Sequence, residues 1–157
     1  MSSIGSKAPA FRLQNDFGGW TELSELTAAG PVLLVFYPKD FGIVCTKQLC
    51  AYQEALENFA SYGIKLVGIS KNPPDQLRTF RDEYKFQFPL LSDPGHAVAK
   101  LYSVTSLVMM GGTSRAVVVV GKSCMVVYRY VEATTITHRK ANELLKILEQ
   151  LKSKGAI

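Results

Sequence analysis

The chain has 157 residues, of which 47% are hydrophobic and 20% charged, and its formal net charge is +5. These values are typical of a globular protein with a sizeable core, and the length predicts one domain over residues 1–157. The charge is modest and forms no basic stripe interleaved with aromatic residues, which argues against nucleic-acid binding. Because neither a signal-peptide pattern nor a membrane-length apolar run is found, we expect a cytoplasmic protein with no membrane partner.

The first half of the chain predicts a hairpin, a buried strand and a helix. Turn residues at 15–19 (NDFGG) separate two short segments, which indicates an N-terminal β-hairpin. Residues 32–37 form an apolar run rich in β-branched side chains, as in a central strand. From residue 44 to about 62, apolar residues recur at spacings of three or four, which predicts one helix ending at Gly63.

The second half continues the alternation of strands and helices. Its predicted elements are a strand at 65–70, a helix from 73 to about 85, a short strand at 88–91, a short helix after the turn at 92–95, a loop at 109–114, a hairpin of strands 116–120 and 125–131, and an amphipathic helix at 137–152. This order predicts an α/β protein with a mixed central sheet flanked by helices, compatible with the thioredoxin-like architecture.

The most informative segment is FYPKDFGIVCTKQLC, residues 36–50. It places Cys45 where a Pro-bearing loop becomes a helix, and Cys50 follows five residues later. A thiol at a helix N-terminus lies near the positive end of the backbone dipole and near unpaired N–H groups. This setting favours the reactive thiolate. The segment therefore indicates a redox or nucleophilic thiol with a second thiol at hand.

A bond between the two thiols conflicts with the helix that carries them. On a continuous helix, five residues correspond to about 140° of rotation and roughly 7.5 Å of rise. A disulfide needs Cα atoms within about 7 Å and converging Cβ directions. If Cys45 and Cys50 oxidise to a disulfide, the first one or two helical turns must therefore unwind.

Other interpretations of the cysteines stay open at this point. Both Cys45 and Cys50 could be buried apolar residues, as free cysteines often are. No metal site is expected, because His96 and His138 lack metal-ligand spacing to the pair. Cys124 lies in a turn between two predicted strands; we interpret it as a bystander, and the alternative is a second resolving thiol.

With these residues in place, the chain resembles the peroxiredoxins. Their active-site motif is Pro-x-x-x-Thr/Ser-x-x-Cys, and the subgroup with a second cysteine five residues on is the bacterioferritin comigratory protein or peroxiredoxin Q. Segments that resemble the family in the expected order extend over most of the chain, at residues 4–11, 68–70, 88–93 and 114–115.

The resemblance implies a thiol-dependent peroxidase for hydrogen peroxide and alkyl hydroperoxides, with thioredoxin or a similar dithiol protein as reductant. It assigns Cys45 as the peroxidatic cysteine, Cys50 as the resolving cysteine and disulfide partner, and Arg115 as the group that stabilises the thiolate. Pro38 would shield the site, and the N–H groups of Val44 and Cys45 would face the peroxide oxygens. No cofactor and no metal are implied. We expect a monomer or a weak homodimer.

Two positions of the predicted substrate-binding set depart from the family pattern. Gly42 stands where Thr or Ser is usual, so it supplies no hydroxyl, and Gln48 stands where the subgroup commonly has Glu. Losing one hydrogen bond to a transition state can cost on the order of 10²-fold in rate. Two alternatives therefore stand beside the enzyme: a weakened peroxidase that acts as a redox sensor or relay, and a binding module with inert thiols.

Two apolar groups near the motif carry weaker predictions. Phe41, Tyr84, Phe86 and Phe88 could cover the cysteine or line a dimer face, or simply pack in the core. Val108, Met109 and Met110 could form an apolar wall that favours bulky hydroperoxides, or fill the core.

Overall fold

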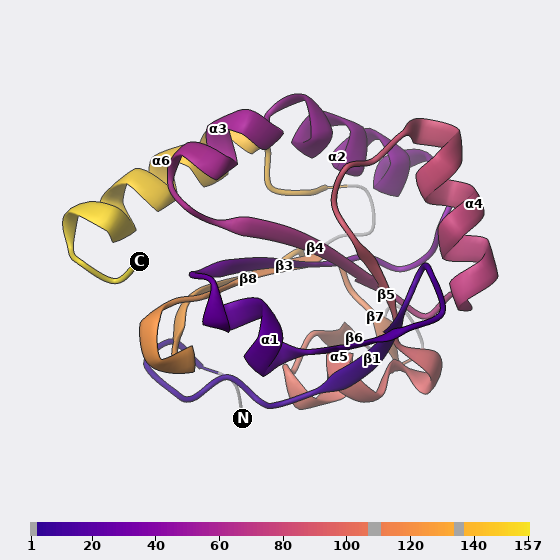
Figure 1. Cartoon of the computed structure of the whole chain (residues 1–157), viewed down its shortest axis with the longest axis horizontal. Coiled ribbons are helices and arrows are strands. Elements are labelled where there is room, and N and C mark those ends of the chain that lie inside the picture. The colour runs from indigo at the N-terminus through magenta and orange to yellow at the C-terminus, as the bar shows by residue number, and fades with distance from the viewer. Residues whose placement is uncertain (1–2, 107–110, 134–136) are drawn as a thin grey trace.

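The protein is built on a seven-stranded mixed sheet (Figure 1). The computed structural model describes residues 3–106, 111–133 and 137–157. The strand order is β2-β1-β5-β4-β3-β8-β9, in which β3, β4 and β5 run parallel and β8 lies antiparallel to β3. The strands are β1 Arg12–Asn15, β2 Trp20–Glu22, β3 Val32–Phe36, β4 Lys65–Ser70, β5 Leu90–Ser92, β8 Ala116–Val120 and β9 Val126–Val131, with β6 Thr105–Ser106 and β7 Gly112–Thr113 forming a separate small pair.

Helices cover both faces of the sheet (Figure 1). In the view of Figure 1, α2, α3, α4 and α6 lie above the sheet, and α1 and α5 lie below it. The helices are α1 Leu23–Ala28, α2 Ile43–Glu54, α3 Leu56–Ser61, α4 Pro74–Tyr84, α5 Ala97–Leu101 and α6 Ala141–Ser153, with single 3-10 turns η1 Pro94–His96 and η2 Lys122–Cys124. In the described ranges no helix combines the length and apolar character needed to cross a membrane.

Strand β3 is the centre of the core because all five of its residues are buried. Successive side chains of a strand point to opposite faces. Leu34 accordingly packs in the cluster that contains α1 and α5 residues, whereas Leu33 and Val35 pack in the cluster that contains α2, α4 and α6 residues. The apolar run read from the sequence is therefore a strand buried on both faces, and the thioredoxin-like fold with its N-terminal hairpin is confirmed.

The structure corrects two predicted helices and adds short elements that were not predicted. The helix predicted over residues 44–62 is divided at Ala55, where the backbone leaves α-helical geometry although hydrogen bonds continue on both sides of the kink. The last helix begins at Ala141 rather than at 137, because the Glu143 carboxylate accepts the Lys140 N–H at 3.1 Å and caps the helix there. Helix α1 and the small β6–β7 pair were not predicted, since segments this short carry little periodic signal.

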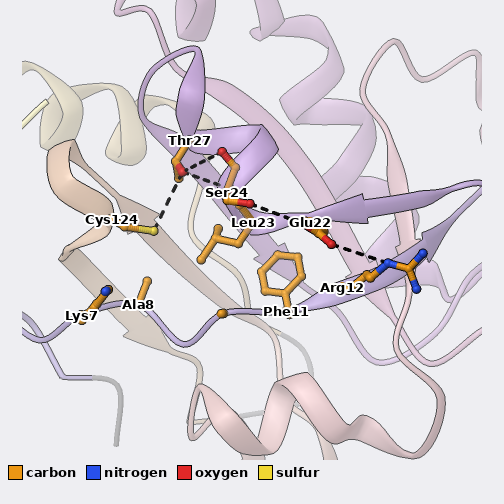
Figure 2. A pocket seen from close by; sticks show the side chains of 10 residues that line it. Lys7, Ala8, Phe11, Arg12, Glu22, Leu23, Ser24, Thr27 and Cys124 are labelled. Atoms are coloured by element: carbon orange, nitrogen blue, oxygen red, sulfur yellow. Dashed lines mark hydrogen bonds and ion pairs between the residues drawn. The ribbon is translucent and has the colours of Figure 1, made fainter.

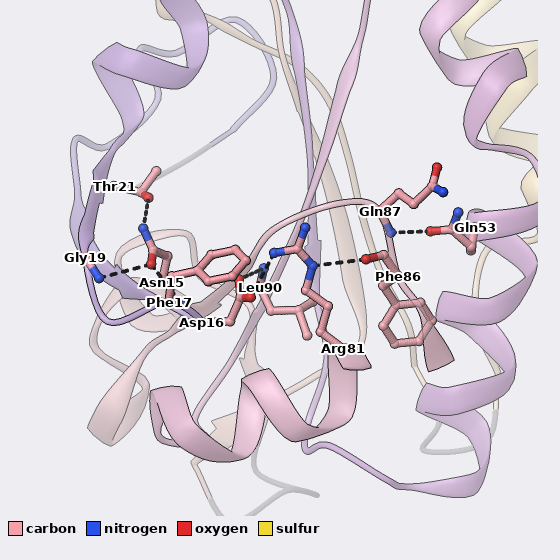
Figure 3. Close-up of polar contacts among 10 residues, drawn as sticks. All are labelled: Asn15, Asp16, Phe17, Gly19, Thr21, Gln53, Arg81, Phe86, Gln87 and Leu90. Atoms are coloured by element: carbon pink, nitrogen blue, oxygen red, sulfur yellow. Dashed lines mark hydrogen bonds and ion pairs between the residues drawn. The ribbon is translucent and has the colours of Figure 1, made fainter. Parts of the chain in front are cut away.

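A partly buried ion pair attaches the N-terminal hairpin to the rest of the fold (Figure 3). Arg81 on α4 lies 2.8 Å from the Asp16 carboxylate, and its Nε donates to the Phe86 carbonyl at 3.0 Å. The other oxygen of Asp16 accepts the Leu90 N–H at 3.2 Å. One carboxylate thus joins the hairpin, α4 and β5.

Replacing Asp16 with Ala should lower the free energy of unfolding by about 2–4 kcal/mol, because the substitution leaves a guanidinium and a buried N–H without their acceptor. Urea denaturation measures this loss. The control is Glu22→Ala, which removes the half-exposed partner of Arg12 and should cost less than about 1 kcal/mol. Equal losses in the two variants would contradict the role given to Asp16.

Candidate active site

Cys45 lies in the first turn of α2, directly beyond the C-terminal end of β3. It is the third residue of the helix and only 1% exposed. The first helical hydrogen bond runs from Thr46 N–H to the Gly42 carbonyl at 2.8 Å. The preceding N–H groups, including those of Val44 and Cys45, therefore have no acceptor within the helix and can serve an anion. The predicted loop-to-helix position of the thiol is confirmed.

Arg115 makes the direct polar contact with this thiol. Its Nη2 donates to Cys45 Sγ at 3.2 Å, and Arg115 itself is 7% exposed. The antiparallel pairing of β3 with β8 sets Phe36 opposite Ala116, so the residue before Ala116 lies beside the loop that follows Phe36. A guanidinium in a largely buried site stabilises negative charge on sulfur. The structure thus joins two residues that lie 70 positions apart in the sequence.

Gly42 is the N-cap of α2 and lies against the thiol. A Cβ at this position would be 3.7 Å from Cys45 Sγ and 3.6 Å from the Lys39 carbonyl, which is ordinary contact. Its backbone angles, φ −67° and ψ 143°, are open to any residue. The position therefore faces the reacting sulfur and has room for a small side chain.

Gln48 lies one turn after Cys45 on the same helix and is 1% exposed. Its Nε2 donates to the Tyr52 hydroxyl at 3.2 Å, and that hydroxyl donates to the Arg139 carbonyl. Burial raises the pKa of Tyr52 well above its ordinary value, so the phenol stays protonated and remains a donor. Gln48 Oε1 is buried without a hydrogen-bond partner in the described part of the chain. The bonds observed for Gln48 thus hold α2 against the segment before α6.

Cys50 and Pro38 are the remaining predicted site residues, one on α2 and one on the loop before it. Cys45 and Cys50 are both free thiols on an unbroken α2, so the geometry expected of the reduced protein is present. Burial, and secondarily Glu54, raises the pKa of the Cys50 thiol. Pro38 is buried and lines a cavity of about 210 Å³ whose other walls are Lys39, Lys71, His96, Gly112 and Thr113.

Asp40 is a residue of the site to which the sequence analysis assigned no role. It is 4% exposed, and its Oδ1 accepts the Tyr37 hydroxyl at 2.7 Å and the Ser70 hydroxyl at 3.3 Å. The Asp40 N–H donates to Asn72 Oδ1 at 2.8 Å. These bonds attach the loop before Cys45 to the end of β4. The signal in the sequence was a carboxylate between Pro38 and the thiol, but only the fold supplies its partners.

Cys124 lies at the opposite end of the sheet from Cys45. It follows β8, whose Val120 pairs with Val32 at the start of β3, whereas Cys45 follows the end of β3. The five residues of β3 span about 13 Å. Cys124 instead lines a cavity of about 600 Å³, with its Sγ 3.9 Å from Thr27 Oγ1 (Figure 2). The position of Cys124 favours its interpretation as a bystander over the alternative of a second resolving thiol.

The two apolar groups have different outcomes. Phe86 and Phe88 are buried in the core, while Phe41 is 44% exposed and packs on Phe80 with ring centroids 4.8 Å apart. Tyr84 lies at the margin of the same cluster and is 38% exposed. Residues 108–110, for which an apolar wall or core filling was predicted, lie outside the described residues.

Comparison with known proteins agrees with this geometry. The AhpC/TSA family matches residues 4–129. Chloroplastic peroxiredoxin Q of Oryza sativa subsp. japonica is 35% identical over 149 residues, which cover 95% of this chain and 68% of the relative. The chain belongs to the AhpC/TSA family, in its peroxiredoxin Q subgroup. It is therefore a peroxiredoxin, a thiol-dependent peroxidase.

Further relatives extend the likeness. Chloroplastic peroxiredoxin Q of Sedum lineare is 34% identical over 148 residues, which cover 94% of this chain and 78% of that protein. The crystal structure of a peroxidoxin from Mycobacterium tuberculosis superimposes with a TM-score of 0.84 at 26% identity and covers 98% of each chain. Similarity to peroxiredoxins over nearly the whole chain favours the enzyme over the alternative of a binding module with inert thiols.

Within this peroxiredoxin, the predicted site residues fall into two groups. Cys45, Arg115, Gly42 and Val44 meet at the start of α2, with Gln48 one turn further on. Pro38 lies on the loop before the helix, and Cys50 lies five residues beyond Cys45 on another side of the helix. The roles assigned to each residue by resemblance stay predictions that the following variants address.

Gly42→Thr should accelerate the reaction of Cys45 with hydrogen peroxide by at least tenfold. A hydroxyl at the N-cap would lie beside the sulfur and supply a hydrogen bond that glycine lacks. Stopped-flow measurement of thiol loss gives the rate constant. The matched control is Gly42→Ala, which adds the carbon without the hydroxyl. Equal rates for the Thr and Ala variants would show that the hydroxyl has no catalytic value here.

Proposed function

We propose that this peroxiredoxin reduces hydrogen peroxide and alkyl hydroperoxides at Cys45 and resolves the product through Cys50. The observation that carries the proposal is the 3.2 Å contact between Arg115 Nη2 and Cys45 Sγ at the N-terminus of α2. Guanidinium and helix N–H groups together stabilise a thiolate and the charge that develops on the peroxide oxygens. Pro38, buried on the preceding loop, limits the access of water to the sulfur.

The first step is nucleophilic displacement at oxygen. The Cys45 thiolate attacks the terminal peroxide oxygen, the O–O bond breaks, and the departing alkoxide or hydroxide takes up a proton. The products are the Cys45 sulfenic acid and an alcohol or water. Val44 and Cys45 N–H groups and Arg115 are placed to hold the two oxygens during the transfer.

The second step requires α2 to open. The Cys50 thiol displaces hydroxide from the sulfenic sulfur, which gives a Cys45–Cys50 disulfide and water. Five residues of intact helix keep the thiols apart, so the turns before Cys50 must unwind. Gln53 accepts the Gln87 N–H at 2.7 Å and is placed to keep the rest of α2 attached (Figure 3).

An external dithiol then restores the enzyme. A thioredoxin-like protein attacks the disulfide, forms a mixed disulfide and leaves with its own cysteines oxidised, while Cys45 and Cys50 return as thiols. We further propose that the protein acts in the cytoplasm, in antioxidant defence and redox homeostasis, as a monomer or weak homodimer. Gly42 supports a second candidate, a slow peroxidase whose disulfide state serves as a redox sensor or relay.

The cysteine variants test the cycle. Cys45→Ser should abolish peroxide consumption, and Cys50→Ser should consume one equivalent of peroxide and then stop, because its sulfenic acid has no resolving partner. The measurements are peroxide loss with a thioredoxin system and sulfenic acid labelling. Cys124→Ser is the control and should keep turnover. Steady-state turnover by Cys45→Ser would overturn the proposal, and slow turnover with complete disulfide formation in the unchanged protein would favour the sensor.

A further inference from the structure

The loop between β3 and the catalytic helix is held by one buried carboxylate. Asp40 accepts hydroxyl hydrogen bonds from Tyr37, on its own loop, and from Ser70, at the end of β4. Through its own N–H it also binds Asn72, which lies just before α4. The Ser70 hydroxyl lies 3.4 Å from Asn72 Oδ1 as well, which closes the network. Four residues from two chain segments thus meet beneath the loop that presents Cys45.

The loop needs such an anchor because its backbone is strained. Phe41, between Asp40 and the N-cap Gly42, has φ 60°, in the left-handed region that a non-glycine residue occupies at a cost of about 1 kcal/mol. This conformation persists only where the surroundings enforce it. The bonds of Asp40 fix the backbone on one side of Phe41, and α2 fixes it on the other side.

The surroundings of the carboxylate are polar but contain no observed ion pair. Tyr37 from the loop, Ser70 from β4 and Asn72 from the segment before α4 face it, and Cys45 on α2 lies close enough to Tyr37 to influence its ionisation. No salt bridge to Asp40 is found in the described ranges. The second oxygen, Asp40 Oδ2, is buried without a hydrogen-bond partner there.

We propose that Asp40 is a positioning residue of the peroxidase site, whose ionised carboxylate holds the 37–42 loop so that Cys45 faces Arg115. The inference rests on the peroxidase function proposed above. Asp40 does not contact the reacting sulfur in this arrangement; it acts through Tyr37 and Ser70. A charged acceptor binds hydroxyl donors more strongly than a neutral one does, so ionisation tightens the anchor.

The direction of the pH dependence follows from the two hydroxyl hydrogen bonds, and burial sets the pH range. Burial raises the pKa of Asp40 from 3.8 to about 6, against the hydrogen bonds of Tyr37 and Ser70, which lower it. The carboxyl is therefore neutral below this range and ionised above it; burial disfavours the charge, and the bonds from Tyr37 and Ser70 are the interactions that gain strength when the charge forms. Asparagine has the shape of the neutral acid and never ionises.

Asp40→Asn tests the proposal by comparison with the unchanged protein at each pH from 5 to 8. The quantity measured is the second-order rate constant for loss of the Cys45 thiol with hydrogen peroxide. The ratio of variant to unchanged protein should be near one at pH 5 and fall about fivefold by pH 7.5, where only the unchanged protein carries the charge. Asp82→Asn, which removes an exposed carboxylate on α4, should give the same ratio at every pH.

A second variant separates positioning from a general loss of stability. Tyr37→Phe keeps the ring and removes the 2.7 Å donor, so it should slow the reaction at pH 7.5 by a similar factor. The double variant should be little slower than either single one, because both act through the same bond. A pH-independent ratio for Asp40→Asn, or simple multiplication of the two effects, would overturn the proposal. Failure of the unchanged protein to react would instead overturn the peroxidase function itself.

Discussion

The pairing of β3 with β8 is the constraint on which the site depends. Both strands are fully buried, and their register sets Phe36 opposite Ala116. The chain leaves β3 toward Cys45 and enters β8 from Arg115, so one row of backbone hydrogen bonds fixes the meeting of thiol and guanidinium. A one-residue slip would exchange the side chains of β8 between the two packed faces of the sheet, which makes the register costly to change. The contact between Arg115 and Cys45 is therefore set by the packing of the core.

The loop before Cys45 is held in one conformation, whereas the proposed resolution through Cys50 needs the helix that follows to open. Asp40 and its partners hold the loop in one conformation, and Gln48 and Tyr52 attach α2 to the segment before α6. Resolution through Cys50 requires the same helix to open at its start. The first turn lacks a side-chain cap at Gly42, which leaves its N–H groups available to an anion. The departure from the family pattern at this position therefore concerns the groups that surround the thiol.

Two cavities lie toward opposite ends of the sheet. On the loop before the thiol, Pro38 shares a small cavity with Lys39, Lys71 and His96. At the far end, Cys124 shares a larger cavity with Lys7 and Phe11. The length of β3 separates Cys45 from this third cysteine.

The sequence by itself determined the alternation of strands and helices, the buried central strand and the placement of Cys45 at a helix start, because these follow from local periodicity and from a loop that ends at a thiol. It also indicated Cys50 and Arg115 by resemblance. The kink at Ala55, the start of α6 at Ala141 and the short α1 were decided by capping and packing, to which periodicity is insensitive. Only the tertiary structure decided the partners of Arg115, Gln48 and Asp40. The contacts of Arg115 with Cys45 and of Asp40 with Ser70 and Asn72 join residues distant in the chain, and they depend on how the strands pair in the sheet.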